Sequence, residues 1–187
     1  SIGYNDKELE AIPETSILGV GCGVPLNFAD LKEGDTVLDL GSGAGIDAFL
    51  ASKIVKESGK VIGIDFTHEM LMKSRKAAAE NGFKNVEFKK GDIENNIPVV
   101  NNSVDAAISN CVINLTKDKV KTFREIYRIL KKGGMGRMII SDLITSKEVE
   151  EKSVNSERWC SCVDGALTKE NYLKSIEVAG FQNIVVL

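Results

Sequence analysis

The chain has 187 residues, with 24 Lys or Arg and 27 Asp or Glu, and therefore a net charge of −3. Its hydrophobic content of 43% is typical of one soluble globular domain and too high for a disordered chain. A pI of about 5.4 disfavours the basic surface that nucleic-acid binding requires. The sequence shows neither an apolar run long enough to cross a bilayer nor a leader pattern. We therefore expect a cytoplasmic domain that binds neither nucleic acid nor membrane.

The first residues are expected to form a short helix followed by a glycine-rich loop. Asn5 and Glu8 have the spacing of a capping box, and Pro13 would end the helix that they begin. Residues 17–25 contain three glycines, which favour a loop that can approach a ligand closely. Beyond this loop, apolar runs and helical periodicity predict, in order, strand 36–40, helix 46–56, strand 60–65, helix 68–81, strand 85–89, strand 103–109, helix 119–130, strand 136–143, irregular chain over 148–165, helix 169–179 and strand 183–187.

This alternation predicts an α/β fold: a doubly wound, mostly parallel sheet with helices on both faces. Such sheets bind ligands at the carboxyl ends of their strands. We expect a single domain over residues 1–187, made of an N-terminal helix and cysteine loop (1–30), a cofactor-binding core (31–145), and a substrate-side segment with the last helix and strand (146–187). Because the chain begins without Met and ends in an apolar run, we also expect it to be part of a longer protein.

A glycine-rich turn, Gly41-Ser-Gly-Ala-Gly45, connects the first predicted strand to the helix that follows it. Backbone N–H groups and the start of a helix can face a polar ligand at such a turn. The dinucleotide-binding fingerprint Gly-x-Gly-x-x-Gly would require its third glycine where this chain has Ile46. The spacing therefore disfavours a nicotinamide dehydrogenase.

The stretch from Val37 to Gly45, Val-Leu-Asp-Leu-Gly-Ser-Gly-Ala-Gly, resembles motif I of the class I S-adenosylmethionine methyltransferases. The resemblance implies their Rossmann-like fold and S-adenosylmethionine as cofactor. It places Asp65 on the ribose hydroxyls, Phe66 on the adenine face, and the Asp92-Ile93 loop at the adenine edge. The residues expected to bind or frame the cofactor are Asp39, Gly41, Ser42, Gly43, Gly45, Asp65, Phe66, Met70, Gly91, Asp92, Ile93 and Asn110.

Each of these positions also has a purely structural interpretation. Asp65 and Asp92 are residue types that occur in turns and caps, and Phe66 could belong to the core. Asp39 is expected to hold the glycine turn in place rather than to take part in chemistry. The cofactor interpretation is favoured because the residues follow three successive predicted strands.

Four cysteines stand at positions 22, 111, 160 and 162. With no Cys-x-x-Cys pair and one histidine, a structural zinc site is poorly supplied with ligands. Any one cysteine alone is best explained as a small buried apolar residue. However, Cys22 lies in the glycine-rich loop, Cys111 follows the fourth predicted strand, and Cys162 follows the fifth. These three could converge above the sheet.

Three stretches resemble the arsenite S-adenosylmethionine methyltransferase family: Leu-Gly-Val-Gly-Cys-Gly-Val-Pro at 18–25, Ile-Ser-Asn-Cys-Val-Ile-Asn-Leu at 108–115, and Cys-Ser-Cys-Val-Asp-Gly-Ala-Leu at 160–167. The resemblance implies methyl transfer to trivalent arsenic, arsenite or methylarsenite, as in arsenic detoxification. Soft thiolates suit that metalloid. Cys111 and Cys162 would hold the arsenic, and Cys22 would act as a third thiol or form a disulfide during turnover.

The same resemblance implies further parts of this picture. Asn110 would lie beside the amino-acid end of the cofactor, and an external thiol reductant would complete each cycle. We expect the chain to lack the longer C-terminal region of that family. Cys160 is expected to be dispensable, because in a helical segment side chains two residues apart, such as those of Cys160 and Cys162, do not face the same way.

Two other functions remain as alternatives from the sequence. A C-methyltransferase of a ubiquinone or menaquinone precursor, or of another small molecule, would share motif I but would use an apolar pocket instead of thiols. A non-catalytic metalloid-binding protein would use the thiols but would not need Asp65 and Asp92 to bind a nucleoside.

Overall fold

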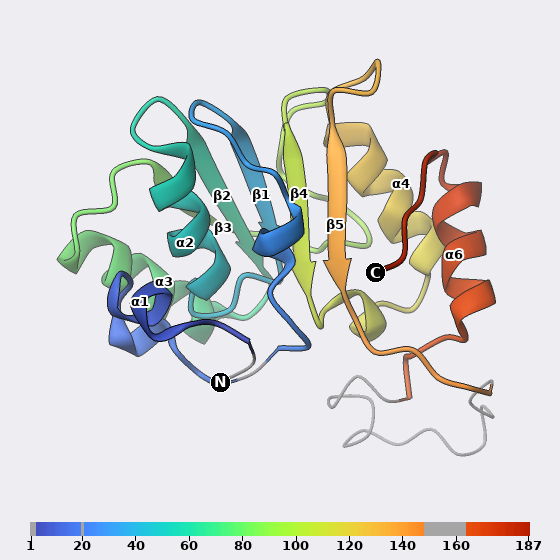
Figure 1. The fold of residues 1–187 in the computed structure, drawn as a ribbon, viewed down its shortest axis with the longest axis horizontal. Helices are drawn as coiled ribbons and strands as arrows, with labels where there is room; N and C mark the ends of the chain where they lie inside the picture. The colour runs from blue at the N-terminus through green and yellow to red at the C-terminus, as the bar shows by residue number, and fades with distance from the viewer. Residues whose placement is uncertain (1–2, 20, 148–163) are drawn as a thin grey trace.

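The computed structural model describes residues 3–19, 21–147 and 164–187. In that part of the chain five strands form one sheet in the order β3-β2-β1-β4-β5, and every neighbouring pair is parallel (Figure 1). β2 and β3 therefore lie on one side of β1, and β4 and β5 lie on the other. The strands are β1 (Thr36–Leu40), β2 (Lys60–Asp65), β3 (Val86–Lys90), β4 (Ala106–Asn110) and β5 (Arg137–Ser141).

Helices cover both faces of this sheet. One face carries α2 and α3, and the other carries α4 and α6 (Figure 1). This confirms the predicted doubly wound α/β architecture. The α-helices are α1 (Asp6–Glu10), α2 (Ile46–Val55), α3 (His68–Glu80), α4 (Lys119–Ile129) and α6 (Lys169–Val178), and the short 3-10 helices are η1 (Glu14–Ser16), η2 (Pro25–Phe28) and η3 (Ile113–Leu115).

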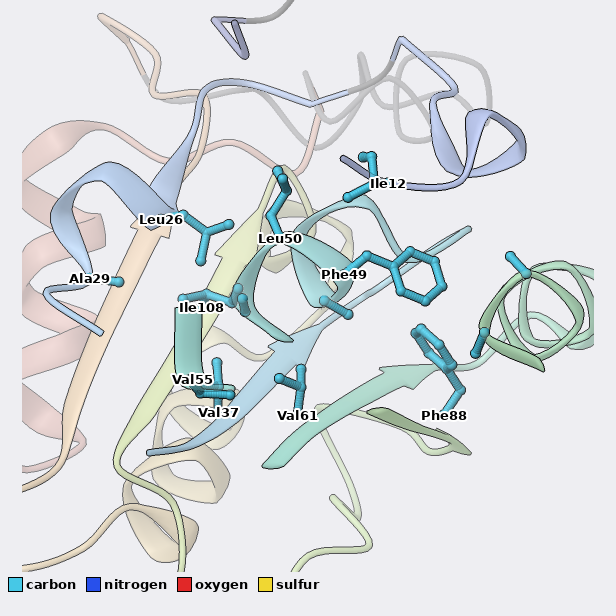
Figure 2. Packing of buried hydrophobic residues seen from close by; sticks show 14 of the residues in the cluster. Ile12, Leu26, Ala29, Val37, Phe49, Leu50, Val55, Val61, Phe88 and Ile108 are labelled. Carbon is cyan, nitrogen blue, oxygen red and sulfur yellow. The ribbon is translucent and has the colours of Figure 1, made fainter. Parts of the chain in front are cut away.

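The alternation of side chains along β1 builds a separate core on each face. Val37 packs with Phe49 of α2 in the first cluster (Figure 2), whereas Leu38 and Leu40 point to the opposite face and pack with Phe123 of α4. All five side chains are fully buried. Burial of an apolar side chain of this size contributes about 1.5–3 kcal/mol, so the two cores hold β1 firmly between them.

The N-terminal capping box forms as predicted. The Glu8 N–H donates to Asn5 Oδ1 at 3.0 Å, and the Asn5 N–H donates to Glu8 Oε2 at 2.8 Å. The helix that they begin ends at Glu10. Pro13 then precedes η1, consistent with its expected role of ending the helix.

The predicted sixth strand at 183–187 is wrong. Those residues are irregular, and Val185 and Leu187 are 77% and 85% exposed. The apolar run has high β propensity, but a strand also needs a partner, and within the described residues β5 pairs with β4 alone. β4 also starts three residues later than predicted, because the Ser103 and Val104 N–H groups bond to the Ile129 carbonyl of α4 instead of a strand.

The carboxyl ends of all five strands meet at one edge of the sheet, the lower edge in Figure 1. The glycine turn leaves β1 there, Asp65 ends β2, and Cys111 and Asp142 follow β4 and β5. None of the helices in the described ranges is both long and apolar enough to cross a membrane.

Candidate active site

The glycine turn is shaped by glycines with different constraints. Gly41 has φ +66°, and a Cβ there would collide with the Val112 side chain. Gly45, with φ +99°, begins α2, and a Cβ there would lie 2.8 Å from the Phe49 ring. A Cβ on Gly43 (φ +51°) would meet nothing within 4 Å. The turn is therefore packed against the protein at both ends and open at its centre.

Asp65 closes this turn from the end of β2. Its Oδ2 accepts the Gly43 N–H at 2.9 Å, and its Oδ1 accepts the Thr67 N–H at 2.8 Å. The carboxylate thus performs the turn-stabilising role that was the structural alternative. A carboxylate has about four acceptor sites, so ribose hydroxyls could still bind to it. The cofactor role of Asp65 stays a prediction.

Phe66 does not belong to the core, since it is 75% exposed beside the open turn. That position is compatible with its predicted contact to the adenine face. Met70, in the first turn of α3, is half-buried. No contact in the structure tests a cofactor role for either side chain.

The loop after β3 holds its own acidic side chain. Asp92 accepts from the Asn95 side chain at 2.6 Å and from the Glu94 N–H at 2.9 Å. The Asn95 hydrogen bond is the largest of the causes that lower the pKa of Asp92. Gly91 packs its backbone against Pro98, and Ile93 is half-buried on the second core. Asp92 is exposed and serves as a turn residue here, so its predicted contact with adenine stays untested.

Two buried carboxyl groups lie behind the glycine turn. Asp39 and Asp47 are each 3% exposed. Burial raises the pKa of both, and the charge of Asp47 raises the pKa of Asp39 further. Asp39 Oδ2 and the Ser42 hydroxyl are buried and have no hydrogen-bond partner. Buried polar atoms normally have one, so these two atoms are unused hydrogen-bonding groups beside the turn.

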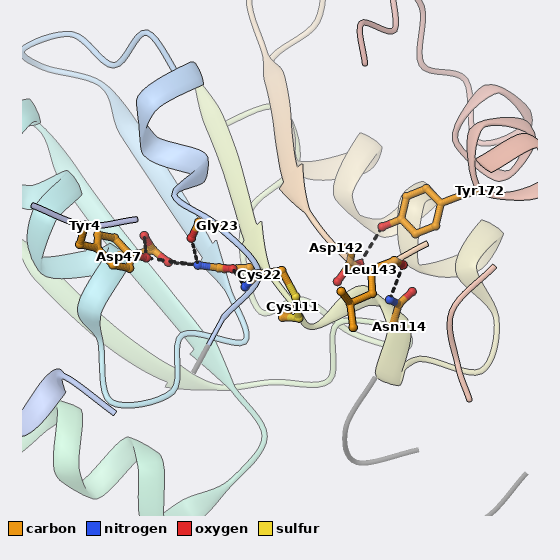
Figure 3. Close-up of a disulfide and its surroundings, with 10 residues drawn as sticks. Tyr4, Cys22, Gly23, Asp47, Cys111, Asn114, Asp142, Leu143 and Tyr172 are labelled. Carbon is orange, nitrogen blue, oxygen red and sulfur yellow. Dashed lines mark hydrogen bonds between the residues drawn. A yellow bond between two sulfur atoms is a disulfide. The ribbon is translucent and has the colours of Figure 1, made fainter. Parts of the chain in front are cut away.

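Asn110, at the end of β4, connects this region to the N-terminal loop. Its Oδ1 accepts the Cys22 N–H at 2.8 Å, and its Nδ2 donates to the Gly23 carbonyl at 2.8 Å and to Asp47 Oδ2 at 3.2 Å. The Tyr4 hydroxyl donates to the other oxygen of Asp47 at 2.8 Å (Figure 3). Sequence reasoning found Asn110 but missed Tyr4 and Asp47. An acidic residue in the first helical turn was the one available signal.

Cys22 and Cys111 are joined by a disulfide that links positions 89 residues apart, with their Cα atoms 5.4 Å from each other (Figure 3). Both are half-buried, so neither is a fully buried packing residue. Cys111 has φ +62°, a left-handed conformation that is uncommon outside glycine, and its N–H donates to the Ser141 carbonyl at 2.8 Å. This left-handed residue directly follows β4.

The third expected arsenic ligand, Cys162, and its neighbour Cys160 lie outside the described residues. Their roles stay predictions. Among the residues that the structure describes, no group of three or more His, Cys, Asp or Glu side chains could hold a metal ion.

A second tyrosine–aspartate pair lies beyond the disulfide. The Tyr172 hydroxyl of α6 donates to Asp142 Oδ2 at 2.8 Å (Figure 3), and Asp142 Oδ1 is buried without a partner. Burial raises the pKa of Asp142 to about 6, although the Tyr172 hydrogen bond and the Lys119 charge oppose this. Sequence reasoning did not identify this pair either.

Residues 31–180 match the model of a methyltransferase domain. The chain belongs to the methyltransferase domain family. It is 40% identical over 186 residues to an arsenite methyltransferase of Halobacterium salinarum, covering 99% of this chain and 47% of that relative. It is also 39% identical to a human arsenite methyltransferase, covering 82% of this chain and 42% of that relative. This methyltransferase chain therefore spans about half the length of these curated relatives.

Solved structures agree with this assignment. The crystal structure of an arsenic(III) S-adenosylmethionine methyltransferase from Chlamydomonas reinhardtii superposes with a TM-score of 0.79 at 32% identity, covering 93% of this chain and 60% of that one. A SAM-dependent methyltransferase from Aquifex aeolicus gives 0.68 at 28% identity, covering 95% and 84%. The resemblance to arsenite methyltransferases expected from the sequence is confirmed.

Proposed function

We propose that this domain transfers a methyl group from S-adenosylmethionine to trivalent arsenic held by cysteine thiolates. The observation that carries the proposal is the position of Cys22 and Cys111, adjacent to each other at the carboxyl edge that also bears the glycine turn. The relatives described above carry the name arsenite methyltransferase, which supports the same substrate. A quinone methyltransferase would have no need for a thiol pair at this edge.

The residues of the turn fit the cofactor. The open face of Gly43 leaves space, Asp39 Oδ2 and Ser42 Oγ offer unused polar atoms, and Phe66 exposes its ring. In this proposal Asp65 takes the ribose hydroxyls and Asn110 lies at the amino-acid end. When bound, S-adenosylmethionine supplies a methyl group on a sulfonium, which is open to attack by a lone pair.

Cysteine thiols bind arsenite by displacing its hydroxyl groups as water, and the bound arsenic keeps its lone pair. Cys111 and Cys162 are the proposed ligands. The task of the protein is then to hold this lone pair in line with the methyl group, so positioning matters more than proton transfer. A general base is not required.

The disulfide of Cys22 and Cys111 gives this site two states. In the disulfide, Cys111 has no thiolate for arsenic, so an external thiol must reduce the pair before substrate binds. Methyl transfer oxidises arsenic to the pentavalent state. The Cys22 thiolate then attacks the sulfur of Cys111: the S–S bond forms, the As–S bond to Cys111 breaks, and its electron pair stays on arsenic, which returns to the trivalent form. As part of this proposal we place the protein in the cytoplasm, where such thiols are abundant.

The test is transfer of labelled methyl groups from S-adenosylmethionine to arsenite by the purified 187-residue chain, with and without dithiothreitol. We expect thiol-dependent transfer that Cys111→Ser reduces at least a thousandfold, with S-adenosylmethionine affinity unchanged by calorimetry. Cys160→Ser is the matched control and should retain activity. Transfer that persists in Cys111→Ser, or cofactor binding with no arsenite-dependent transfer, would contradict the proposal. The latter result would favour another methyl acceptor.

A further inference from the structure

One side chain, Asn110, holds the backbone of both paired cysteines. It directly precedes Cys111 in the chain, and its amide bonds to the N–H of Cys22 and the carbonyl of Gly23, each at 2.8 Å. A Cβ on Gly21 would lie 3.0 Å from Asn110 Nδ2, so the glycine loop fits closely around this amide. The separation of the two sulfur atoms therefore depends on how Asn110 is oriented.

Asp47 fixes that orientation. Asn110 Nδ2 donates to Asp47 Oδ2 at 3.2 Å, and the other oxygen of Asp47 accepts from the Tyr4 hydroxyl, so Asp47 presents an acceptor to the amide. If the amide were flipped, its oxygen would face the carboxylate oxygen, and the Cys22 N–H would lose its acceptor. The observed orientation is thus the one in which all of these groups are paired.

Tyr4 in turn holds Asp47. Its hydroxyl donates to Asp47 Oδ1 at 2.8 Å and also accepts from Asn110 Nδ2 at 3.2 Å. Burial and the charge of Asp47 raise the pKa of Tyr4, so the phenol keeps the proton that it donates. Asp39 is the other carboxyl group whose charge acts on Tyr4. The result is a continuous chain of buried and half-buried hydrogen bonds from Tyr4 to Cys22.

We propose that Tyr4 and Asp47 are positioning residues that, through Asn110, set how readily Cys22 and Cys111 form their disulfide. The inference deepens the proposed function, because disulfide closure is one of its steps, but it does not depend on which acceptor is methylated. When the two thiols are held close together, each is presented to the other at high effective concentration. Loosening Asn110 lowers that concentration and makes the disulfide easier to reduce.

The experiment is a redox titration in mixtures of reduced and oxidised glutathione. Two cysteine thiols give up two electrons and two protons, and one glutathione disulfide becomes two glutathione thiols. The parent protein carries Cys160→Ser and Cys162→Ser, so that Cys22 and Cys111 are the only thiols left to react. Alkylation of free thiols followed by intact-mass analysis gives the oxidised fraction.

Tyr4→Phe should lower the equilibrium constant for disulfide formation about threefold. Asp47→Asn should lower it about tenfold, which corresponds to a potential about 30 mV more oxidising. Tyr172→Phe is the matched control. Tyr4 and Tyr172 are 5% and 7% exposed, and both donate to an aspartate at 2.8 Å, Asp47 being buried and Asp142 half-buried. Tyr172, however, belongs to the core on the other face of the sheet.

Thermal unfolding of each variant separates positioning from stability. We expect Tyr4→Phe and Tyr172→Phe to lose similar amounts of stability, with the potential shifted in Tyr4→Phe alone. Equal potentials in the parent, Tyr4→Phe and Asp47→Asn would overturn the inference, and so would an equal shift in Tyr172→Phe. The titration contains neither arsenic nor S-adenosylmethionine, so failure of methyl transfer and failure of this inference are independent results.

Discussion

The two halves of the carboxyl edge are built in different ways. In the turn half, made of the glycine turn 41–45 and residues 65–67, the key hydrogen bonds run from backbone N–H groups to the Asp65 carboxylate, as from Gly43 and Thr67. In the thiol half, Tyr4, Cys22, Asp47 and Asn110 come from distant parts of the chain, and side-chain hydrogen bonds hold them. One half depends on local backbone shape, the other on long-range packing.

Because of this difference, the two halves tolerate different kinds of substitution. The turn needs glycine at a few positions, because other residues adopt a positive φ only at an energetic cost. The thiol half needs particular pairs of side chains, and the loss of one partner leaves the other buried and unpaired. Val112 connects the halves, since it follows Cys111 and packs directly on Gly41.

The largest effect on stability is expected at this connection. Gly41→Ala should lower the unfolding free energy by about 2–5 kcal/mol, because a left-handed alanine costs about 1–2 kcal/mol and overpacking against Val112 adds about 1–3 kcal/mol. Gly43→Ala is the matched control, with a similar positive φ but open space around the added methyl group. It should lose only about 1–2 kcal/mol.

Urea unfolding of the two variants measures this difference. Equal losses would mean that Val112 moves aside freely and that the turn half and the thiol half are not connected by packing. If Gly41→Ala also changes the reactivity of the Cys111 thiol while Gly43→Ala does not, the connection reaches the cysteine itself.

The turn half could be predicted from the sequence because its signals are local. The glycine spacing, the apolar strand before it and Asp65 at the next strand end lie within about thirty residues. The same holds for the capping box of Asn5 and Glu8. Each feature restricts the backbone near itself, so its geometry follows from residue type.

The thiol half could not be predicted to the same depth. Tyr4 and Asp47 are separated by 43 residues and Asn110 and Cys22 by 88, and no periodic pattern marks either pair. Family resemblance indicated that Cys22 could form a disulfide, but the residues alone left its partner open. The prediction of a sixth strand was wrong for a related reason. The apolar run at 183–187 has high β propensity, but the sequence does not show which strand it would pair with.

A second prediction concerns the Asp142–Tyr172 pair, which lies beyond the disulfide of the thiol half. The folded pKa of about 6 lies above the ordinary value of 3.8. The folded state therefore holds this proton more tightly, and the stabilisation that the proton provides is complete below about pH 4. It is lost as the pH rises through 6, by up to about 3 kcal/mol in total.

Asp142→Asn removes this dependence, because asparagine stays neutral and can still accept from the Tyr172 hydroxyl. The unfolding free energy of the native chain, relative to the variant, should fall between pH 4 and pH 6.5 and then level off. Asp39 and Asp47 also have raised pKa values, but their contributions cancel in the difference. A difference that is constant with pH would show that folding does not raise the pKa of Asp142.

The smallest effect is expected at Phe66, where the turn half meets solvent. The ring is 75% exposed, so Phe66→Ala should change the unfolding free energy by less than about 0.5 kcal/mol. If the ring lies on the adenine face, loss of that stacking should weaken S-adenosylmethionine binding by about 0.5–1.5 kcal/mol, or about 2- to 12-fold. Phe28→Ala, another exposed phenylalanine, is the control and should leave affinity unchanged. Calorimetric titration of both variants decides the matter: equal affinities would remove Phe66 from the cofactor site and leave Asp65 and the glycine turn as its proposed contacts.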